Sequence, residues 1–190
     1  MEHGLDPESV IDEAHGRRSI ETIRLLAPHL DAVQENVRVE SMEIADRRGV
    51  KALPGADDLL RHLPSHRFTV VTSATRALAQ ARMHHAGLSL PARFVSADDV
   101  REGKPSPEPY LKGAQLLGFA PADCLVFEDT PSGIASARAG GMSVIAVATT
   151  YPSSTLTAAD AVVGSLADAN VLAGDGGLEA QLEPLYFARS

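Results

Sequence analysis

The sequence has one cysteine, fewer basic than acidic residues, and no long apolar run. The lone Cys124 excludes an internal disulfide and a zinc site built from cysteines. The 17 Lys and Arg against 25 Asp and Glu give a formal net charge of −8, which argues against a nucleic acid or an anionic membrane surface as the partner. No apolar stretch approaches the roughly 18–20 residues of a membrane span. The first ten residues also lack the pattern of a signal peptide, so we expect a cytoplasmic protein.

Residues 1–50 contain helical patterns and no strand pattern. Residues 6–8 (DPE) combine an N-cap carboxylate, a proline at the first helical position and an acid in the first turn. Ile20 and Ile23 are spaced to share one face of a second helix. A third helix is expected from about residue 31 to residue 48. We therefore predict a small helical unit over residues 1–50.

From residue 51 onward, short apolar strand patterns alternate with helical patterns of about ten residues. The strand patterns are RFTVVTSAT, ARFVSADD, DCLVFED, MSVIAVAT and a short edge strand, AVVGSL. This alternation predicts right-handed βαβ units. We expect residues 51–190 to form an α/β core with a doubly wound, Rossmann-like parallel sheet, and we assign no structure to the tail from residue 169.

Polar residues follow three of these patterns, and ligands of such sheets bind beyond the carboxyl ends of the strands. Thr72 and Ser73 are hydroxyls that suit a phosphate oxygen, although such residues are also common helix caps. Glu128 and Asp129 are adjacent acids that suit Mg²⁺, although one of them could instead cap the next helix. Lys104 lies in a proline-stiffened loop (GKPSP), where it either neutralises a phosphate or is exposed to solvent.

Taken together, these motifs resemble the haloacid dehalogenase superfamily, in its branch of small-cap sugar and polyol phosphatases. VVTSAT is similar to the second motif of the family, GKPSPEPY to the third and FEDTPSGIASARAGG to the fourth. The stretch HGRRSIETIR is similar to the cap of glycerol-phosphate and deoxysugar-phosphate phosphatases. The resemblance covers nearly the whole chain and implies that residues 1–50 form part of a helical cap.

The resemblance also implies a Mg²⁺-dependent phosphomonoester hydrolase that acts on a small phosphosugar or polyol phosphate. By this likeness Thr72 and Ser73 bind the phosphoryl oxygens and Lys104 offsets negative charge, while Glu128 and Asp129 hold the metal. A phosphomutase shares these motifs and stays an alternative. Dehalogenase activity fits less well, because the lysine and the acid pair suit a phosphate better than a haloacid.

In the cap, the resemblance makes His15, Arg17 and Arg18 candidates for selecting the substrate. The alternative is that they form a solvated basic turn after a helix. The motifs identify neither the particular phosphorylated substrate nor the oligomeric state.

The first motif of the family, an Asp-x-Asp pair at the end of the first core strand, has no match after any strand pattern of this sequence. By the resemblance its first Asp is the nucleophile and its second is the general acid and base. That strand would precede the cap and lie mid-sheet, between the strands ending at Thr72 and Asp129. We favour a mis-assigned or cut start; a short form acting as a non-catalytic phosphate-binding or interaction module is the alternative. Either way, we expect the bare chain to be inactive.

Overall fold

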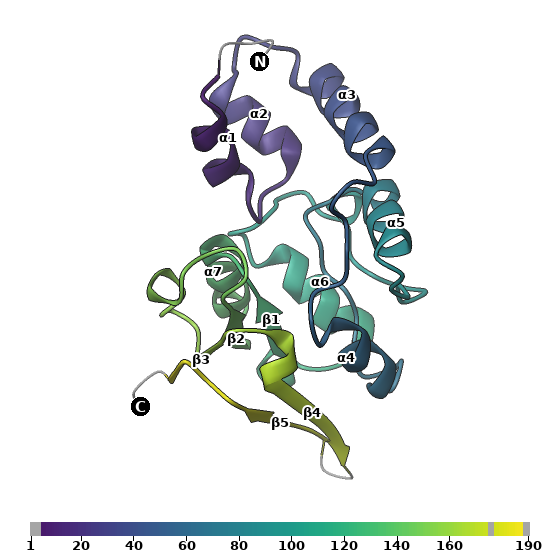
Figure 1. The fold of residues 1–190 in the computed structure, drawn as a ribbon, viewed down its shortest axis with the longest axis vertical. Coiled ribbons are helices and arrows are strands. Elements are labelled where there is room, and N and C mark those ends of the chain that lie inside the picture. Colours follow the sequence, from purple (N-terminus) through teal and green to yellow (C-terminus); the bar gives the residue numbers. More distant parts are fainter. Residues whose placement is uncertain (1–4, 175–176, 188–190) are drawn as a thin grey trace.

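A computed structural model of the chain describes residues 5–174 and 177–187, with helices α1–α3 at one end and an α/β part at the other (Figure 1). The helices are α1 (Pro7–Ala14), α2 (Ser19–Leu26), α3 (Ala32–Ala45), α4 (Ala56–His62), α5 (Arg76–His85), α6 (Glu108–Leu117) and α7 (Pro131–Ala139). The strands are β1 (Leu125–Glu128), β2 (Ser143–Val147), β3 (Ala161–Val163), β4 (Ala169–Gly174), β5 (Gly177–Leu182) and β6 (Tyr186–Phe187). None of the described helices has the length and apolar character needed to cross a membrane.

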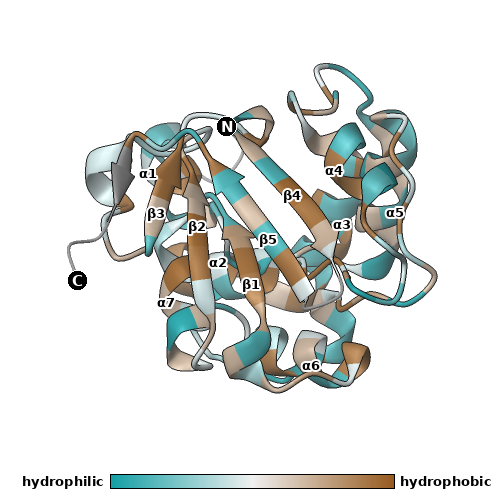
Figure 2. Ribbon diagram, turned by 90° about the horizontal axis from the view of Figure 1, so that it is seen from below, coloured by the Kyte–Doolittle hydropathy of each residue, from teal (hydrophilic) through white to brown (hydrophobic). Residues whose placement is uncertain are grey.

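The main sheet has the strand order β1-β2-β3-β6, and the pairs β1–β2 and β2–β3 are parallel. Val144, Ala146 and Val162 are fully buried in it, as expected for strands that are covered on both faces. Figure 2 shows β1, β2 and β3 side by side, with their apolar residues in brown. The predicted α/β fold with a parallel sheet is therefore confirmed.

The first two predicted strands are only partly formed. Between them the structure has one isolated parallel bridge, Val71–Val95, rather than two full strands. Three backbone hydrogen bonds still join the segments: Thr72 N to Val95 O, Val95 N to Val70 O, and Ala97 N to Ala74 O, each 2.9 Å. Segment 67–71 also lines a cavity together with Leu125, Val126 and Phe127 of β1. The absence of a first core strand stays a prediction.

The unassigned tail forms an antiparallel hairpin of β4 and β5. On β5, Ala180 and Leu182 pack against a buried cluster that includes Ile145 and Val163 of the main sheet. The hairpin lies in front of the sheet in Figure 2. Its pattern is weak because β4 buries only its alternate residues at the start and is exposed at its far end. The alternation of apolar and polar residues was therefore too weak to predict these two strands.

The three expected helices before residue 50 are present. Asp6 caps α1 by accepting a hydrogen bond of 3.0 Å from the Ser9 amide, and Asp31 caps α3 in the same way. Helix α3 ends at Ala45, slightly earlier than predicted, and it has no buried residue. It packs against α2 and α5, so it joins the helical part to the α/β part. The division of the chain at residue 50 stays a prediction.

Candidate active site

A buried cluster of charged side chains lies where β1 meets α7. The side chain of Glu128, the last residue of β1, is buried with 6% of its surface exposed. Its Oε2 accepts hydrogen bonds from the Asp129 and Thr130 amides, both at 2.8 Å, and from the Thr130 hydroxyl at 2.9 Å. The carboxylate therefore lies against the positive N-terminus of α7. Gly133 makes room for it, because a Cβ at that position would overlap the Glu128 carboxyl group.

Lys104 reaches the same carboxylate from the proline-stiffened loop. It is 6% exposed, and its Nζ forms a buried ion pair with Oε1 of Glu128. The Tyr110 hydroxyl of α6 donates to the same Oε1 at 3.0 Å, and Lys104 Nζ lies 4.8 Å from the centre of the Tyr110 ring. The alternative of a solvent-exposed lysine is therefore wrong. The chain buries Lys104 because Glu128 supplies the opposite charge that such burial requires.

The environment shifts the pKa values of both groups that share Glu128 Oε1. Burial would by itself raise the pKa of Glu128, but the adjacent Lys104 charge and the hydrogen bonds hold that pKa below its usual value. Burial, followed by the negative charge of Glu128, raises the pKa of Tyr110 well above its usual value. At neutral pH the site therefore contains a charged Glu128 and a neutral Tyr110 that acts as a hydrogen-bond donor.

Asp129 is the more open of the two acids. It is partly buried, and Thr150 donates a hydrogen bond to its Oδ2. Burial raises the pKa of Asp129, and the neighbouring Glu128 charge adds to this rise against the hydrogen bond from Thr150. A carboxylate in such a place is stabilised by a cation. In contrast, both oxygens of Glu128 already accept hydrogen bonds from the protein.

The acid pair fits a magnesium ion better than a softer metal. Within the part of the chain that the structure describes, no three His, Cys, Asp or Glu side chains gather where they could hold a metal. Mg²⁺ needs no such cluster, because it is held by one or two carboxylates together with water and substrate phosphate. Asp129 supplies a carboxylate of this kind, whereas both oxygens of the adjacent Glu128 already accept hydrogen bonds from the protein.

The two hydroxyls after the first strand pattern point to different partners. The Thr72 hydroxyl accepts a hydrogen bond from the Ala74 amide at 3.1 Å, whereas the Ser73 hydroxyl donates to the Gly16 carbonyl at 2.8 Å. Neither caps the next helix, because Thr75 is the N-cap of α5. Gly16 in turn lies against the start of α7, where a Cβ would fall 2.7 Å from the Ser132 hydroxyl. The structure thus brings Ser73 toward the acid pair through the linker at Gly16.

Of the cap candidates, Arg18 is in contact with the core. Its Nη1 donates to the Arg101 carbonyl at 2.9 Å and pairs with Glu21 at 3.4 Å. Glu21 also accepts a hydrogen bond of 3.2 Å from the amide of Gly103, the residue before Lys104. A side chain at Gly103 would meet the Arg18 side chain, so the glycine permits this close approach. The start of α2 therefore contacts the loop that carries the buried lysine.

The other two cap candidates are farther from that loop. Arg17 pairs with Glu13 at 3.7 Å, and the two side chains are 38% and 42% exposed. The His15 ring packs edge-on against Tyr151, with ring centres 5.9 Å apart. Arg17 fits the alternative of a solvated basic turn, whereas His15 lies against the loop after β2.

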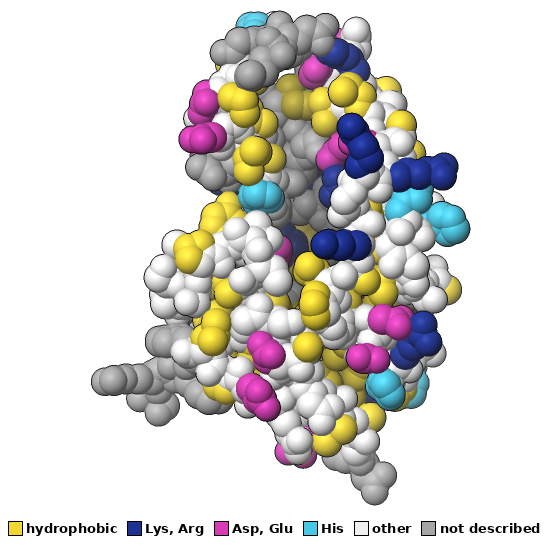
Figure 3. Space-filling view, in the orientation of Figure 1, with side chains coloured by type: hydrophobic (Ala, Val, Ile, Leu, Met, Phe, Trp, Pro, Cys, Tyr) yellow, Lys and Arg dark blue, Asp and Glu magenta, His cyan; other side chains and the backbone are white. Residues whose placement is uncertain are grey.

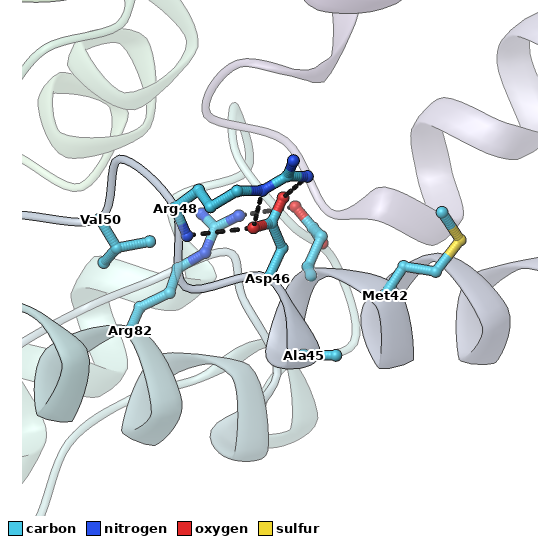
Figure 4. Close-up of a pocket in the computed structure, with 7 residues that line it drawn as sticks. Met42, Ala45, Asp46, Arg48, Val50 and Arg82 are labelled. Atoms are coloured by element: carbon cyan, nitrogen blue, oxygen red, sulfur yellow. Dashed lines mark hydrogen bonds and ion pairs between the residues drawn. The ribbon is translucent and has the colours of Figure 1, made fainter.

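Figure 3 shows a hollow in the surface at the helical end of the molecule. A different cavity, of about 760 Å³, lies between α3 and α5 (Figure 4) and is lined by Met42, Glu43, Ala45, Asp46, Arg48, Val50 and Arg82. Both of its arginines are paired with acids, Arg48 with Asp46 at 2.9 Å and Arg82 with Glu43 at 2.6 Å. None of the predicted site residues lines it. We therefore place the candidate site at Lys104, Glu128 and Asp129.

Sequence reasoning missed three residues of this site. Tyr110 lies in the matched stretch GKPSPEPY, but its role depends on α6 folding back over the lysine. Thr130 caps α7 by accepting a hydrogen bond from the Gly133 amide at 3.1 Å, so the alternative of an acidic cap is wrong. A threonine directly before a proline is an N-cap signal that could have identified it. No local pattern pointed to Thr150.

Thr130→Ala is expected to lower the free energy of unfolding by about 1–2 kcal/mol, because it removes a helix cap together with a hydrogen bond to a buried carboxylate. Urea denaturation followed by circular dichroism would measure this. Thr130→Ser keeps the hydroxyl and is the matched control, with most of the stability retained. Equal losses in both variants would contradict the role of the hydroxyl.

Comparison with known proteins identifies the family of this chain. Residues 8–141 match the family model of the haloacid dehalogenase-like hydrolases. Hexitol phosphatase A of Escherichia coli (strain K12) is 42% identical over 169 residues, which cover 86% of this chain and 78% of that protein. Glycerol-1-phosphate phosphohydrolase 2 of Saccharomyces cerevisiae is 40% identical over 159 residues, which cover 77% of this chain and 63% of that protein.

Among solved structures, a hydrolase from Pseudomonas syringae superposes with a TM-score of 0.74 at 24% identity, covering 86% of this chain and 81% of that one. At this identity the likeness shows the fold alone. The family match spans most of the chain, including helices α2 and α3, the lysine loop and the acid pair. The chain therefore belongs to the haloacid dehalogenase-like hydrolases.

Proposed function

We propose that this chain carries the phosphate-binding and metal-binding groups of a Mg²⁺-dependent phosphatase. Its substrate is a small sugar phosphate or polyol phosphate, and its location is the cytoplasm. The observation that carries the proposal is the buried Lys104–Glu128 pair beside Asp129 at the carboxyl end of β1. The names of two relatives, a hexitol phosphatase and a glycerol-1-phosphate phosphohydrolase, support the substrate class.

In this proposal the phosphate is held by groups that offset its negative charge or donate hydrogen bonds to its oxygens. Lys104 supplies positive charge from a rigid position, because Glu128 and the Tyr110 ring hold its ammonium in place. Ser73 presents a hydroxyl beside the start of α5, and Thr72 stands next to it. Donors that are already oriented before the reaction stabilise developing negative charge without a cost of reorganisation.

Glu128 and Asp129 would hold Mg²⁺, with Asp129 as the more accessible ligand. When bound, the metal neutralises phosphate charge and polarises a phosphoryl oxygen. The chain itself orients Asp129 through the hydrogen bond from Thr150. It fixes Glu128 through the N-terminus of α7, and the Lys104 charge together with these hydrogen bonds holds the pKa of Glu128 below its usual value despite burial.

Residues 1–50 act in this proposal as the cap that excludes water and recognises the leaving group. Arg18 is the best placed of the three cap candidates, because it already contacts the loop before Lys104. His15 and Arg17, in the outer part of the cap, remain candidates for selecting the substrate. A cap held to the core by Arg18 and Glu21 would cover the phosphate while it reacts.

No Asp-x-Asp pair follows a strand pattern in this sequence, so we expect no turnover by the 190-residue chain alone. The alternative, a non-catalytic phosphate-binding module, predicts the same binding without any turnover. A phosphomutase, the other alternative, would use the same groups. Product analysis separates the mutase, because a mutase returns a phosphorylated isomer whereas a phosphatase releases inorganic phosphate.

The test of the proposal is the binding of a hexitol phosphate to the chain by isothermal titration calorimetry. We expect Mg²⁺ to tighten binding about tenfold, which corresponds to about 1.4 kcal/mol, because Asp129 would hold the ion and the ion would neutralise phosphate charge. Asp129→Asn should remove this effect of Mg²⁺.

Asp123→Asn is the matched control, since Asp123 is exposed and lies before the start of β1, whereas Asp129 follows its end. This variant should keep the full response to Mg²⁺. Equal binding with Mg²⁺ and with a chelator in the unmodified chain would refute the metal site.

A further inference from the structure

Glu108, the first residue of α6, holds the loop that precedes the buried lysine. Its carboxylate accepts hydrogen bonds from the Arg101 amide, at 3.1 Å to each oxygen, and from the Glu102 amide at 2.9 Å. Lys112, one turn later in α6, forms an ion pair with the same carboxylate at 2.8 Å. One acid therefore binds two successive backbone amides of the loop, which it does not need to do in order to stabilise its own helix.

The start of α2 binds the other side of the same loop. Arg18 Nη1 donates to the Arg101 carbonyl at 2.9 Å, and the Gly103 amide donates to Glu21 at 3.2 Å. The Nε atom of Arg18 is buried and has no hydrogen-bond partner within the described part of the chain. Burial of an unpaired donor costs free energy, so the contacts that Arg18 makes through Nη1 must hold the side chain in place.

One peptide group joins the two sides of this loop. The Arg101 carbonyl and the Glu102 amide belong to the same peptide bond, which is trans. In a planar trans peptide the C=O and N–H bonds point in opposite directions. Because this N–H points to Glu108, the carbonyl points away from Glu108 and toward Arg18. A charged acceptor on the N–H also polarises the peptide group, which makes its carbonyl a stronger acceptor.

We propose that Glu108 is a positioning residue for the candidate site. Through the peptide group between Arg101 and Glu102 it orients the carbonyl that holds Arg18. It thereby fixes how the start of α2 meets the loop that carries Lys104. This inference rests on the proposed function in one respect, because it makes recognition of the substrate by Arg18 depend on Glu108.

The charge of Glu108 suits this role. The hydrogen bond from Lys112, followed by those from the Glu102 and Arg101 amides, lowers the pKa of Glu108 to about 2. At neutral pH the carboxylate is therefore charged, and both of its oxygens can accept hydrogen bonds. A hydrogen bond to a charged acceptor is stronger than one between neutral groups, so the orientation of the peptide group is well defined.

The alternative is that Glu108 stabilises α6 and nothing else, as an acid in the first turn of a helix commonly does. The chain offers a matched control for this alternative. Asp57 lies in the first turn of α4 and pairs with Arg61, one turn later, at 2.7 Å. Asp57→Asn therefore removes the same helix-stabilising features far from the lysine loop.

The buried Nε of Arg18 gives a direct measurement, because its proton exchanges slowly with water while the side chain is held. NMR of the isotopically labelled chain measures this rate. We expect Glu108→Ala to raise the rate at least about tenfold, since a site that opens more often exchanges faster. Asp57→Asn should leave it unchanged. An unchanged rate in Glu108→Ala, or an equal rise in Asp57→Asn, would overturn the inference.

Two further variants separate the backbone hydrogen bonds from the ion pair. Lys112→Met leaves the Glu108 carboxylate free to hold both amides, so the Arg18 exchange rate should rise less than about twofold. Glu108→Gln keeps the side-chain volume and an acceptor oxygen, and its rate should lie between those of Glu108→Ala and the unmodified chain. Where Glu108→Ala fails to fold, Glu108→Gln decides: a rate equal to that of the unmodified chain would overturn the inference.

Binding separates this inference from the proposed function. Calorimetric titration of a hexitol phosphate with Mg²⁺ is compared for Glu108→Ala and Asp57→Asn. Faster Arg18 exchange together with binding weakened about fivefold in Glu108→Ala, and neither change in Asp57→Asn, supports both proposals. Faster exchange with unchanged binding supports the positioning role and counts against Arg18 as a substrate residue. No binding by the unmodified chain counts against the proposed function, and the exchange rates still decide the inference.

Discussion

Replacing Lys104 by methionine is expected to lower the free energy of unfolding by about 3–5 kcal/mol, the loss typical when one partner of a buried ion pair is removed. Methionine fills a volume similar to that of lysine, so the loss of stability would be due to the missing charge. Glu128 would be left buried beside a helix end without its counterion, with 6% of its surface exposed. Urea denaturation of the purified variant would give the value.

Two further variants test the cause. Lys112→Met removes the ion pair between Lys112 and Glu108, whose side chains are 39% and 25% exposed. This substitution should lower the free energy of unfolding by less than about 1 kcal/mol. Lys104→Met combined with Glu128→Gln removes both buried charges and should recover at least half of the loss. A single Lys104→Met variant as stable as the unmodified chain would show that the pair is not buried in solution.

Gly133→Ala is expected to destabilise the chain by about 3 kcal/mol and to displace the Glu128 carboxyl group. The added methyl group would overlap the carboxylate, and overpacking of this kind in a well-filled site costs about 1–3 kcal/mol or more. The carboxylate cannot move aside easily, because the Thr130 amide and Lys104 hold its two oxygens. Thermal unfolding and urea denaturation would measure the change.

The matched control is Gly174→Ala, where a Cβ meets nothing within 4 Å. Its stability should stay within about 0.5 kcal/mol of the unmodified chain. Crystallography of Gly133→Ala would show whether Glu128 has left Lys104. A variant that keeps both its stability and the ion pair would mean that the helix start can shift to accept the methyl group.

Local sequence patterns predicted most of the helices and strands. The DPE start of α1 and the apolar runs of β1 and β2 depend on residues that are adjacent in sequence, so their patterns were sufficient. Strand β3 also formed where AVVGSL predicted an edge strand, but it lies between β2 and β6 rather than at the edge of the sheet. The β4–β5 hairpin was missed, since its stability comes from Ala180 and Leu182 packing against a sheet formed elsewhere.

At the candidate site, the sequence by itself determined which chemical groups are available: the lysine in a stiff loop, the adjacent acids after a buried strand, and the hydroxyls before a helix. Only the tertiary structure decided how they are used. It paired Lys104 with Glu128 across 24 positions and brought Arg18 to the Arg101 carbonyl across 83. It also chose Thr130 rather than an acid as the cap of α7. The physical reason is that burial and charge pairing depend on contacts between distant segments, whereas strand and helix patterns depend on neighbours.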